Sequence, residues 1–199
     1  MAGPNKQFDH DNVLDKALTL FWEKGFEATS MQQLVDAMGI NRASMYQTYG
    51  NKNELFEASI NRYIDNTLKY LRSLLALDNS PLINLQNAFK GFIRQSLDGQ
   101  LQGCLINNTA IELGPHDLAM AEKIRQVWRQ IEIIFTDLLQ QSIDRNELNK
   151  KTDVSQMASL LNTTLQGLLV KTKAGTSEKD LFSDIDALFD LVRQVNRID

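Results

Sequence analysis

The sequence is poor in cysteine, proline and histidine. Its 199 residues include one cysteine, three prolines and two histidines. The single cysteine, Cys104, excludes an intramolecular disulfide, and two histidines exclude a histidine-rich metal site. Since no proline follows Pro115, long helices are permitted over the rest of the chain. We expect no metal and no cofactor.

Long apolar runs are also absent. No window approaches the roughly 18 consecutive apolar residues that a membrane-spanning helix needs. The first residues, MAGPNKQFDHDN, lack the apolar segment of a signal peptide. Together with the lone cysteine, these absences favour a cytoplasmic protein.

Basic charge is scarce as well. The net charge is −4, and residues 1–56 carry five basic against seven acidic side chains, a net charge of −2. This balance argues against binding nucleic acid through bulk charge. Any such affinity must come from the placement of a few groups.

What the chain does contain is helical periodicity with clear stop signals. We expect an all-α protein with helices at 10–24, from Thr29 or Ser30 to Gly39, 42–49, 52–77, 81–97, 103–113, 116–145, 153–173 and 178–196. The clearest break is Asp78–Pro81, and another falls at Asp98–Gly99. We therefore predict an N-terminal domain over 1–57, a connecting helix over about 52–77 and a C-terminal domain over 78–199.

The helix at 42–49 has an unusual composition. Its apolar side is only Met45 with Tyr49, and its other residues are small or hydrogen-bonding: Arg42, Ala43, Ser44, Tyr46, Gln47 and Thr48. Asn41 is placed to cap its start, and Gly50 ends it. So polar a helix on an apolar support is typical of one that reads a surface such as a DNA groove.

The segments FWEKGFEATSMQQL and DAMGINRASMYQTYGNKNELF resemble the TetR/AcrR family of bacterial transcriptional regulators. The matching positions are Gly39, Ile40, Asn41, Ala43, Ser44, Met45, Tyr46, Tyr49 and Lys52. The resemblance covers residues 8–57. It implies a three-helix helix-turn-helix DNA-binding domain followed by a helical effector-binding and dimerisation domain. Family members often carry an arginine-rich arm before the first helix, whereas this chain has AGPNKQ there.

On this resemblance we expect nine residues to contact DNA: Gln32, Asn41, Arg42, Ala43, Ser44, Tyr46, Gln47, Thr48 and Lys52. Arg42 and Gln47 have side chains suited to guanine and adenine edges, respectively. Lys52, in the first turn of a helix, suits a phosphate. For Tyr46, core packing is an equally weighted alternative.

The segment GCLINNTAIELGPHD, residues 103–117, resembles the pocket helix of some family members, among them regulators that sense electrophiles or oxidants through a cysteine. We expect an effector pocket formed by Phe92, Cys104, Asn107, Asn108 and Trp128. A small apolar or aromatic effector, or an electrophile, fits this set. Packing in the core is the alternative role of Cys104.

The last two predicted helices carry wide apolar faces. We expect Leu161, Leu165, Leu168, Leu188 and Phe189 to form a homodimer interface, as the resemblance implies. A core within one chain is the alternative.

The sequence thus predicts a ligand-responsive repressor that binds a palindromic operator as a dimer. An enzyme is not expected, since Glu112 with His116 is the only acid–base pair worth testing. A helical protein-interaction module, or a ligand-binding protein without DNA activity, is the alternative that the acidic N-terminal region leaves open.

Overall fold

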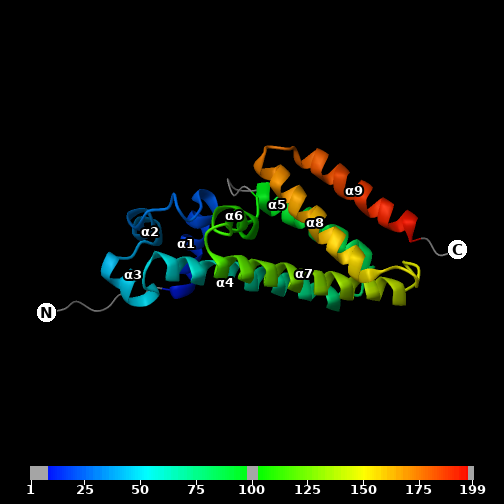
Figure 1. Cartoon of the computed structure of the whole chain (residues 1–199), viewed down its shortest axis with the longest axis horizontal. Coiled ribbons are helices and arrows are strands. Elements are labelled where there is room, and N and C mark those ends of the chain that lie inside the picture. Colours follow the sequence, from blue (N-terminus) through cyan, green and yellow to red (C-terminus); the bar gives the residue numbers. More distant parts are fainter. Residues whose placement is uncertain (1–8, 98–102, 197–199) are drawn as a thin grey trace. The chain divides into compact units, whose positions relative to one another are not determined.

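The structure, a computed structural model, describes residues 9–97 and 103–196 (Figure 1). Over these residues it contains nine α-helices, one 3₁₀ turn and no strand, so the all-α prediction is confirmed. None of the helices in the described ranges has the length and apolarity to cross a bilayer. The predicted break at Asp98–Gly99 and the AGPNKQ arm lie outside the described residues.

The helices follow the predicted order. They are α1 (His10–Lys24), α2 (Met31–Met38), α3 (Arg42–Tyr49), α4 (Lys52–Ser73), α5 (Pro81–Leu97), α6 (Leu105–Glu112), α7 (Leu118–Asp144), α8 (Val154–Lys173) and α9 (Glu178–Val195). Three predicted helices extend two or more residues beyond an observed end. The fourth helix finishes in a 3₁₀ turn, Leu74–Ala76, and α6 and α7 each begin two residues later than predicted.

Local hydrogen bonds explain most of these limits. Ser30 and Gln33 form a reciprocal capping box at the start of α2, which decides between the two predicted starts. Asn51 and Glu54 form a second box at α4, where the Asn51 N–H donates to Glu54 Oε2 at 2.8 Å. Gly50 precedes it with φ +74°, and a Cβ there would overlap the Glu54 carboxylate. That turn therefore requires glycine.

The chain divides into two compact units, residues 1–63 and 64–199, so α4 contributes to both. The predicted domain limits at 57 and 78 lie on either side of this division and stay a prediction.

The first unit has an aromatic core. The Phe56 ring lies 5.0 Å from both Phe21 and Phe26, centroid to centroid, and Trp22 meets Tyr63 edge-on at 4.9 Å. Such pairs contribute about 0.5–1.5 kcal/mol each beyond the area they bury. They hold α1 against α4, the frame on which α2 and α3 stand.

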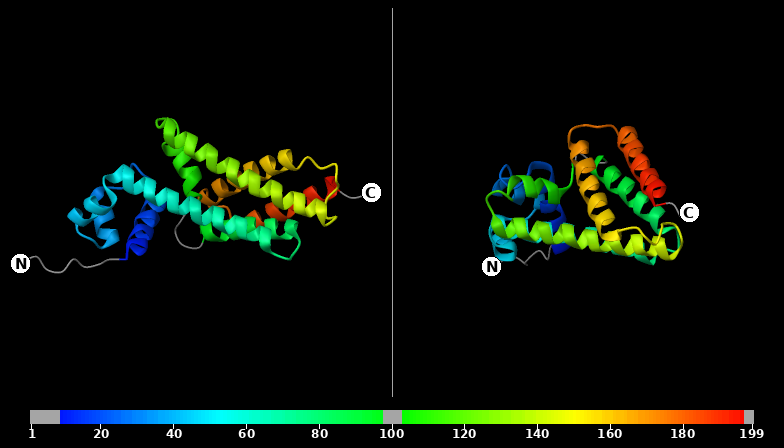
Figure 2. Two further views of the ribbon diagram at one scale, coloured as in Figure 1. Left: turned by 90° about the horizontal axis from the view of Figure 1, so that it is seen from below. Right: turned by 45° about the vertical axis from the view of Figure 1, so that its right-hand side comes forward.

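The second unit is a bundle in which α5 packs against α7, α8 and α9, and α7 packs along α8 (Figure 2). Its centre is a cluster of fully buried rings: Phe89 lies 5.3 Å from Phe189 and 5.8 Å from Phe135. One phenylalanine from each of α5, α7 and α9 therefore joins the three helices around one core.

Candidate nucleic-acid interface and effector site

Helix α3 is capped at its start and anchored at its end. The Asn41 side chain accepts a hydrogen bond from the Ser44 N–H at 2.8 Å, which satisfies one of the open donors of the first turn. At the other end, the Tyr49 hydroxyl donates to the His10 carbonyl at 2.9 Å. Met45 is fully buried between these two points. The helix is thereby fixed through one narrow side.

The opposite side of α3 faces solvent. Its exposed residues are Arg42, Ala43, Tyr46, Gln47 and Thr48, while Ser44 is half-buried. Tyr46 is 44% exposed, so its alternative assignment to the core is wrong. The Arg42 guanidinium lies 5.9 Å from the Tyr46 ring centroid, which keeps both side chains on one face.

Two flanking candidates are already engaged within the unit. The Lys52 ammonium lies 4.4 Å from the Phe26 ring centroid and donates to the Glu27 carbonyl at 3.4 Å. Gln32 donates from Nε2 to Asp36 Oδ1 at 2.9 Å. An ammonium has three N–H donors, so Lys52 retains donors for a phosphate, whereas Gln32 has one amide N–H committed to a carboxylate.

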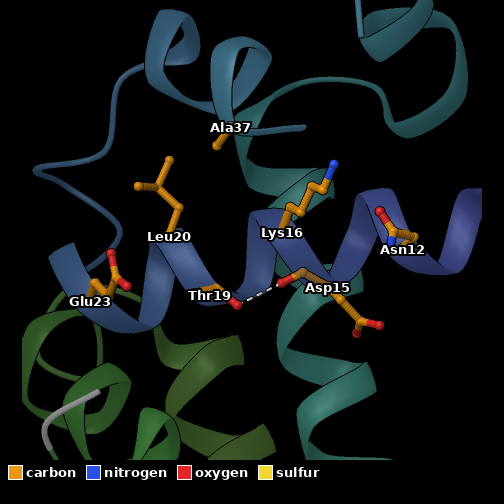
Figure 3. Close-up of a pocket in the computed structure, with 7 residues that line it drawn as sticks. All are labelled: Asn12, Asp15, Lys16, Thr19, Leu20, Glu23 and Ala37. Carbon is orange, nitrogen blue, oxygen red and sulfur yellow. Dashed lines mark hydrogen bonds between the residues drawn. The ribbon is translucent and has the colours of Figure 1, made fainter. Parts of the chain in front are cut away.

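A shallow hollow of about 340 Å³ lies on α1 beside α2 (Figure 3). Its lining residues are Asn12, Asp15, Lys16, Thr19, Leu20, Glu23 and Ala37. Thr19 donates back to the Asp15 carbonyl at 2.9 Å, and the Asp15 carboxylate bonds Arg62. The charges of both signs and the partners within the unit indicate a structural surface.

The start of α6 is anchored to its neighbours through a buried serine. Ser96 Oγ accepts from the Gly103 N–H at 2.8 Å and lies 2.7 Å from Thr172 Oγ1. Gly103 has φ +82°, and a Cβ there would lie 3.3 Å from Asn108 Oδ1. This turn ends at Cys104, the N-cap residue of α6, which is why α6 starts later than predicted.

The five predicted pocket residues have different surroundings. Cys104 and Asn107 are buried, and Asn108 accepts from Lys173 Nζ at 3.1 Å. The Phe92 ring meets Tyr70 edge-on at 5.6 Å. The Trp128 carbonyl accepts from the side chain of Asn162 on α8, at 3.5 Å.

Asn162 and Gln166 were missed from the sequence. They lie four residues apart on α8, and Gln166 Nε2 donates to Asn162 Oδ1 at 2.8 Å. The main-chain carbonyl of Gln166 also accepts from Asn107 Nδ2, at 3.4 Å. Two amides at helical spacing within an apolar run are the signal that points to such a cluster.

The predicted interface residues need correction. Leu161, Leu165, Leu168 and Phe189 are at most 4% exposed, and Leu188 is half-buried. The first four are covered by helices of their own chain and offer no area to a partner. The exposed large apolar side chains of α8 and α9 are instead Leu160, Val170, Leu191 and Val195.

The Glu112–His116 region serves helix geometry. Asp117 caps α7, accepting from the Met120 N–H at 2.9 Å. The His116 N–H donates to the Leu113 carbonyl in the preceding turn, also at 2.9 Å. Both bonds lie at the start of α7, the helix that the sequence predicts from residue 116.

Comparisons with known proteins agree over most of the chain. Residues 13–59 match the family described as bacterial regulatory proteins, tetR family, and residues 81–184 match the tetracyclin repressor-like C-terminal domain. The HTH-type transcriptional regulator YezE of Bacillus subtilis (strain 168) is 33% identical over 184 residues, 92% of this chain and 94% of its own. The transcriptional repressor ComR of Escherichia coli (strain K12) is 32% identical over 182 residues, which are 90% of this chain and 86% of its own.

The fold is shared with solved structures. A cysteine-substituted form of the TetR family regulator CifR, in complex with a 26-bp operator DNA, superposes with a TM-score of 0.84. It is 24% identical in sequence, and the match covers 94% of this chain and 98% of that one. With both halves matched in order and two full-length relatives above 30% identity, the chain belongs to the TetR family of bacterial, DNA-binding transcriptional regulators.

Proposed function

We propose that this regulator is a homodimeric repressor that binds a palindromic operator through α3 and leaves it when a small effector binds the second unit. The observation that carries the proposal is the exposed face of α3, where small and hydrogen-bonding side chains are presented on a helix capped by Asn41 and anchored by Met45. ComR is a repressor by name, and CifR was solved with operator DNA, which supports the same role.

On the DNA, Arg42 and Gln47 read base edges. Both are exposed on α3, and their side chains form paired hydrogen bonds with guanine and adenine in a major groove. Ala43 and Ser44 allow a close approach of the backbone. Tyr46 donates its hydroxyl to a phosphate oxygen, which positions the helix without reading sequence.

Lys52 supplies a sequence-independent contact. Its ammonium is held over Phe26 at the first turn of α4, where the positive end of the helix dipole adds to its charge. Asn41, the exposed N-cap of α3, and Thr48, exposed near its end, contribute secondary contacts. Because unit 1 carries more acidic than basic residues, affinity depends on these few groups.

Two copies associate through α8 and α9. Leu160 and Val170 on α8, with Leu191 and Val195 on α9, are each about half exposed or more in the single chain. Lys171 and Asp184 form an ion pair that ties the two helices together. An isologous four-helix contact would place two α3 helices in successive major grooves, about 34 Å apart.

The effector binds among α6, α7 and α8. Asn107 and Trp128 remain the candidates there, with Phe92, Cys104 and Asn108 at its margins. The effector releases DNA when it binds more tightly to the conformer whose α3 helices are wrongly spaced. The loss of DNA affinity is then set by the difference between the effector's affinities for the two conformers.

The test is a gel-shift titration on the DNA upstream of the gene, with matched scrambled sequences. Arg42→Ala and Gln47→Ala are expected to lose about 1–3 kcal/mol on the operator and little on scrambled DNA. Lys52→Ala weakens binding to both alike. Equal losses on both DNAs for all three variants would contradict the assigned roles.

A further inference from the structure

A set of hydrogen bonds links side chains and main-chain carbonyls of α7, α8 and α6. Asn162 Nδ2 donates to Glu132 Oε1 at 3.2 Å and to the Trp128 carbonyl at 3.5 Å. Gln166 Nε2 donates to Asn162 Oδ1 at 2.8 Å. Asn107 Nδ2 donates to the main-chain carbonyl of Gln166 at 3.4 Å. These five residues form what we call the amide cluster.

The ends of the cluster fix the direction of every amide in it. A carboxylate and a backbone carbonyl only accept, so Asn162 must turn its NH₂ toward Glu132 and Trp128. The Asn162 side-chain oxygen then faces Gln166, which must donate from its own NH₂ group. The main-chain carbonyl of Gln166 likewise only accepts, so Asn107 must turn its NH₂ toward it. Reversing any one amide would place two acceptors or two donors together.

Three side-chain polar atoms of these five residues remain unpaired. Asn107 Oδ1, Gln166 Oε1 and Trp128 Nε1 are buried and have no hydrogen-bond partner among the described residues. Among all the described residues, four buried side-chain atoms lack a hydrogen-bond partner, and three of them belong to residues of the amide cluster. Asn107 itself is 6% exposed. Buried polar groups are rarely left unpaired, so three in one cluster point to a ligand.

We propose that the amide cluster recognises the head group of the effector and that the effector is a neutral carboxamide. This rests on the proposed function and specifies its effector. The two oxygens require two hydrogen-bond donors, and the indole N–H requires one acceptor. A primary amide offers two N–H donors and one carbonyl acceptor, which is this complement.

Charged and purely apolar ligands fit less well. A carboxylate brings only acceptors toward the two amide oxygens and the Glu132 carboxylate nearby. A cation would meet the donor end of the Trp128 N–H, and a hydrocarbon would leave all three atoms unpaired. The apolar body that the sequence favours is retained, and the amide cluster adds the polar end.

The test compares amides with their own dimethylated forms. Acetamide, propionamide and benzamide are titrated into the full-length protein by calorimetry, against N,N-dimethylacetamide, N,N-dimethylpropionamide and N,N-dimethylbenzamide. Dimethylation removes both donors and keeps the acceptor. We expect at least one primary amide to bind about tenfold or more tightly than its partner, since two hydrogen bonds distinguish them. If no pair shows a preference, the proposal is wrong.

Variants locate the site. Asn107→Leu removes one unpaired oxygen at similar volume, and is expected to abolish the preference. Asn84→Leu is the matched control, because Asn84 on α5 is also buried with an unpaired atom, Nδ2, but is not one of the five residues of the amide cluster. Equal loss in both variants would contradict the assignment. Circular dichroism and the Tm of each variant show that it is folded.

A second measurement separates a ligand site from ordinary hydration. A crystal structure with the preferred amide is expected to place its N–H groups on Asn107 and Gln166 and its carbonyl on Trp128. Ordered water on these atoms, unchanged by the amide, would overturn the proposal. Operator binding is measured separately: an amide preference without operator binding would contradict the proposed function alone, and the reverse result would contradict this inference alone.

Discussion

The Tyr49 hydroxyl at the end of α3 donates a hydrogen bond to the His10 carbonyl at the start of α1, over 2.9 Å. Burial, followed by the charge of Asp11, raises the pKa of Tyr49, so the hydroxyl remains a donor across the physiological range. Arg62 from α4 bonds Asp15 through two nitrogens and Asp11 through a third. The end of α3 is therefore tied to α1, and α1 to α4.

Tyr49→Phe tests the first link. The ring stays and one hydrogen bond is lost, so we expect the free energy of unfolding to fall by about 0.5–1.5 kcal/mol in urea titrations. Tyr46→Phe is the matched control on the same helix. Because Tyr46 is exposed, its change should leave stability within about 0.5 kcal/mol and lower operator affinity instead. A loss of stability in Tyr46→Phe with none in Tyr49→Phe would contradict both assignments.

Arg62→Ala tests the second link. Exposed ion pairs contribute about 0.2–1 kcal/mol each, so we expect a loss of about 1 kcal/mol for the pair of contacts. The loss should shrink in 1 M salt, which screens exposed charges. Unfolding curves of both proteins at low and high salt measure it. An effect that is the same at both salt concentrations would mean packing of the arginine stem instead.

Gly103→Ala tests the turn into α6. The glycine has φ +82° and a Cβ would press on Asn108 at 3.3 Å, so we expect destabilisation by about 1–3 kcal/mol. Gly91→Ala is the control, since Gly91 lies within α5 and its Cβ would lie 3.4 Å from the Tyr70 hydroxyl. That change should be neutral or stabilise by about 0.5–1 kcal/mol. Thermal unfolding of both variants decides.

Leu191→Asp tests the proposed dimer. Leu191 is 57% exposed on α9, so the substitution costs little in the single chain but places a charge in the contact. We expect a monomer in analytical ultracentrifugation and a loss of operator affinity. Ile111→Asp is the control, at a residue 71% exposed on α6. A Leu191→Asp protein that remains a dimer would place the interface elsewhere.

Alkylation tests the accessibility of Cys104. The residue is 7% exposed and caps α6 without a hydrogen bond from its side chain to the helix. We expect iodoacetamide to react at least about tenfold more slowly with folded protein than with protein in urea, followed by mass spectrometry. Release of DNA by the reagent from the wild type but not from Cys104→Ser would assign a sensing role. Equal release from both proteins, or release from neither, would leave the residue a packing element.

The order of helices and most of their ends were predictable because their causes are local. Asn41 with Ser44, Ser30 with Gln33, and Asn51 with Glu54 each interact across three residues, a spacing that can be read directly from the chain. The polar surface of α3 was predictable for the same reason, since helical spacing alone separates Met45 from Arg42 and Gln47.

Which apolar residues of the long helices are buried depends on contacts between residues that are distant in the sequence. An apolar stripe must be buried, but its periodicity does not say against what. The tertiary structure puts Leu161, Leu165 and Phe189 inside their own chain, because α5 and α7 cover those faces, and leaves Leu160 and Leu191 outside. The amide cluster arises likewise, where α6, α7 and α8 meet and place Asn107 within hydrogen-bond distance of Gln166, 59 residues further along the chain.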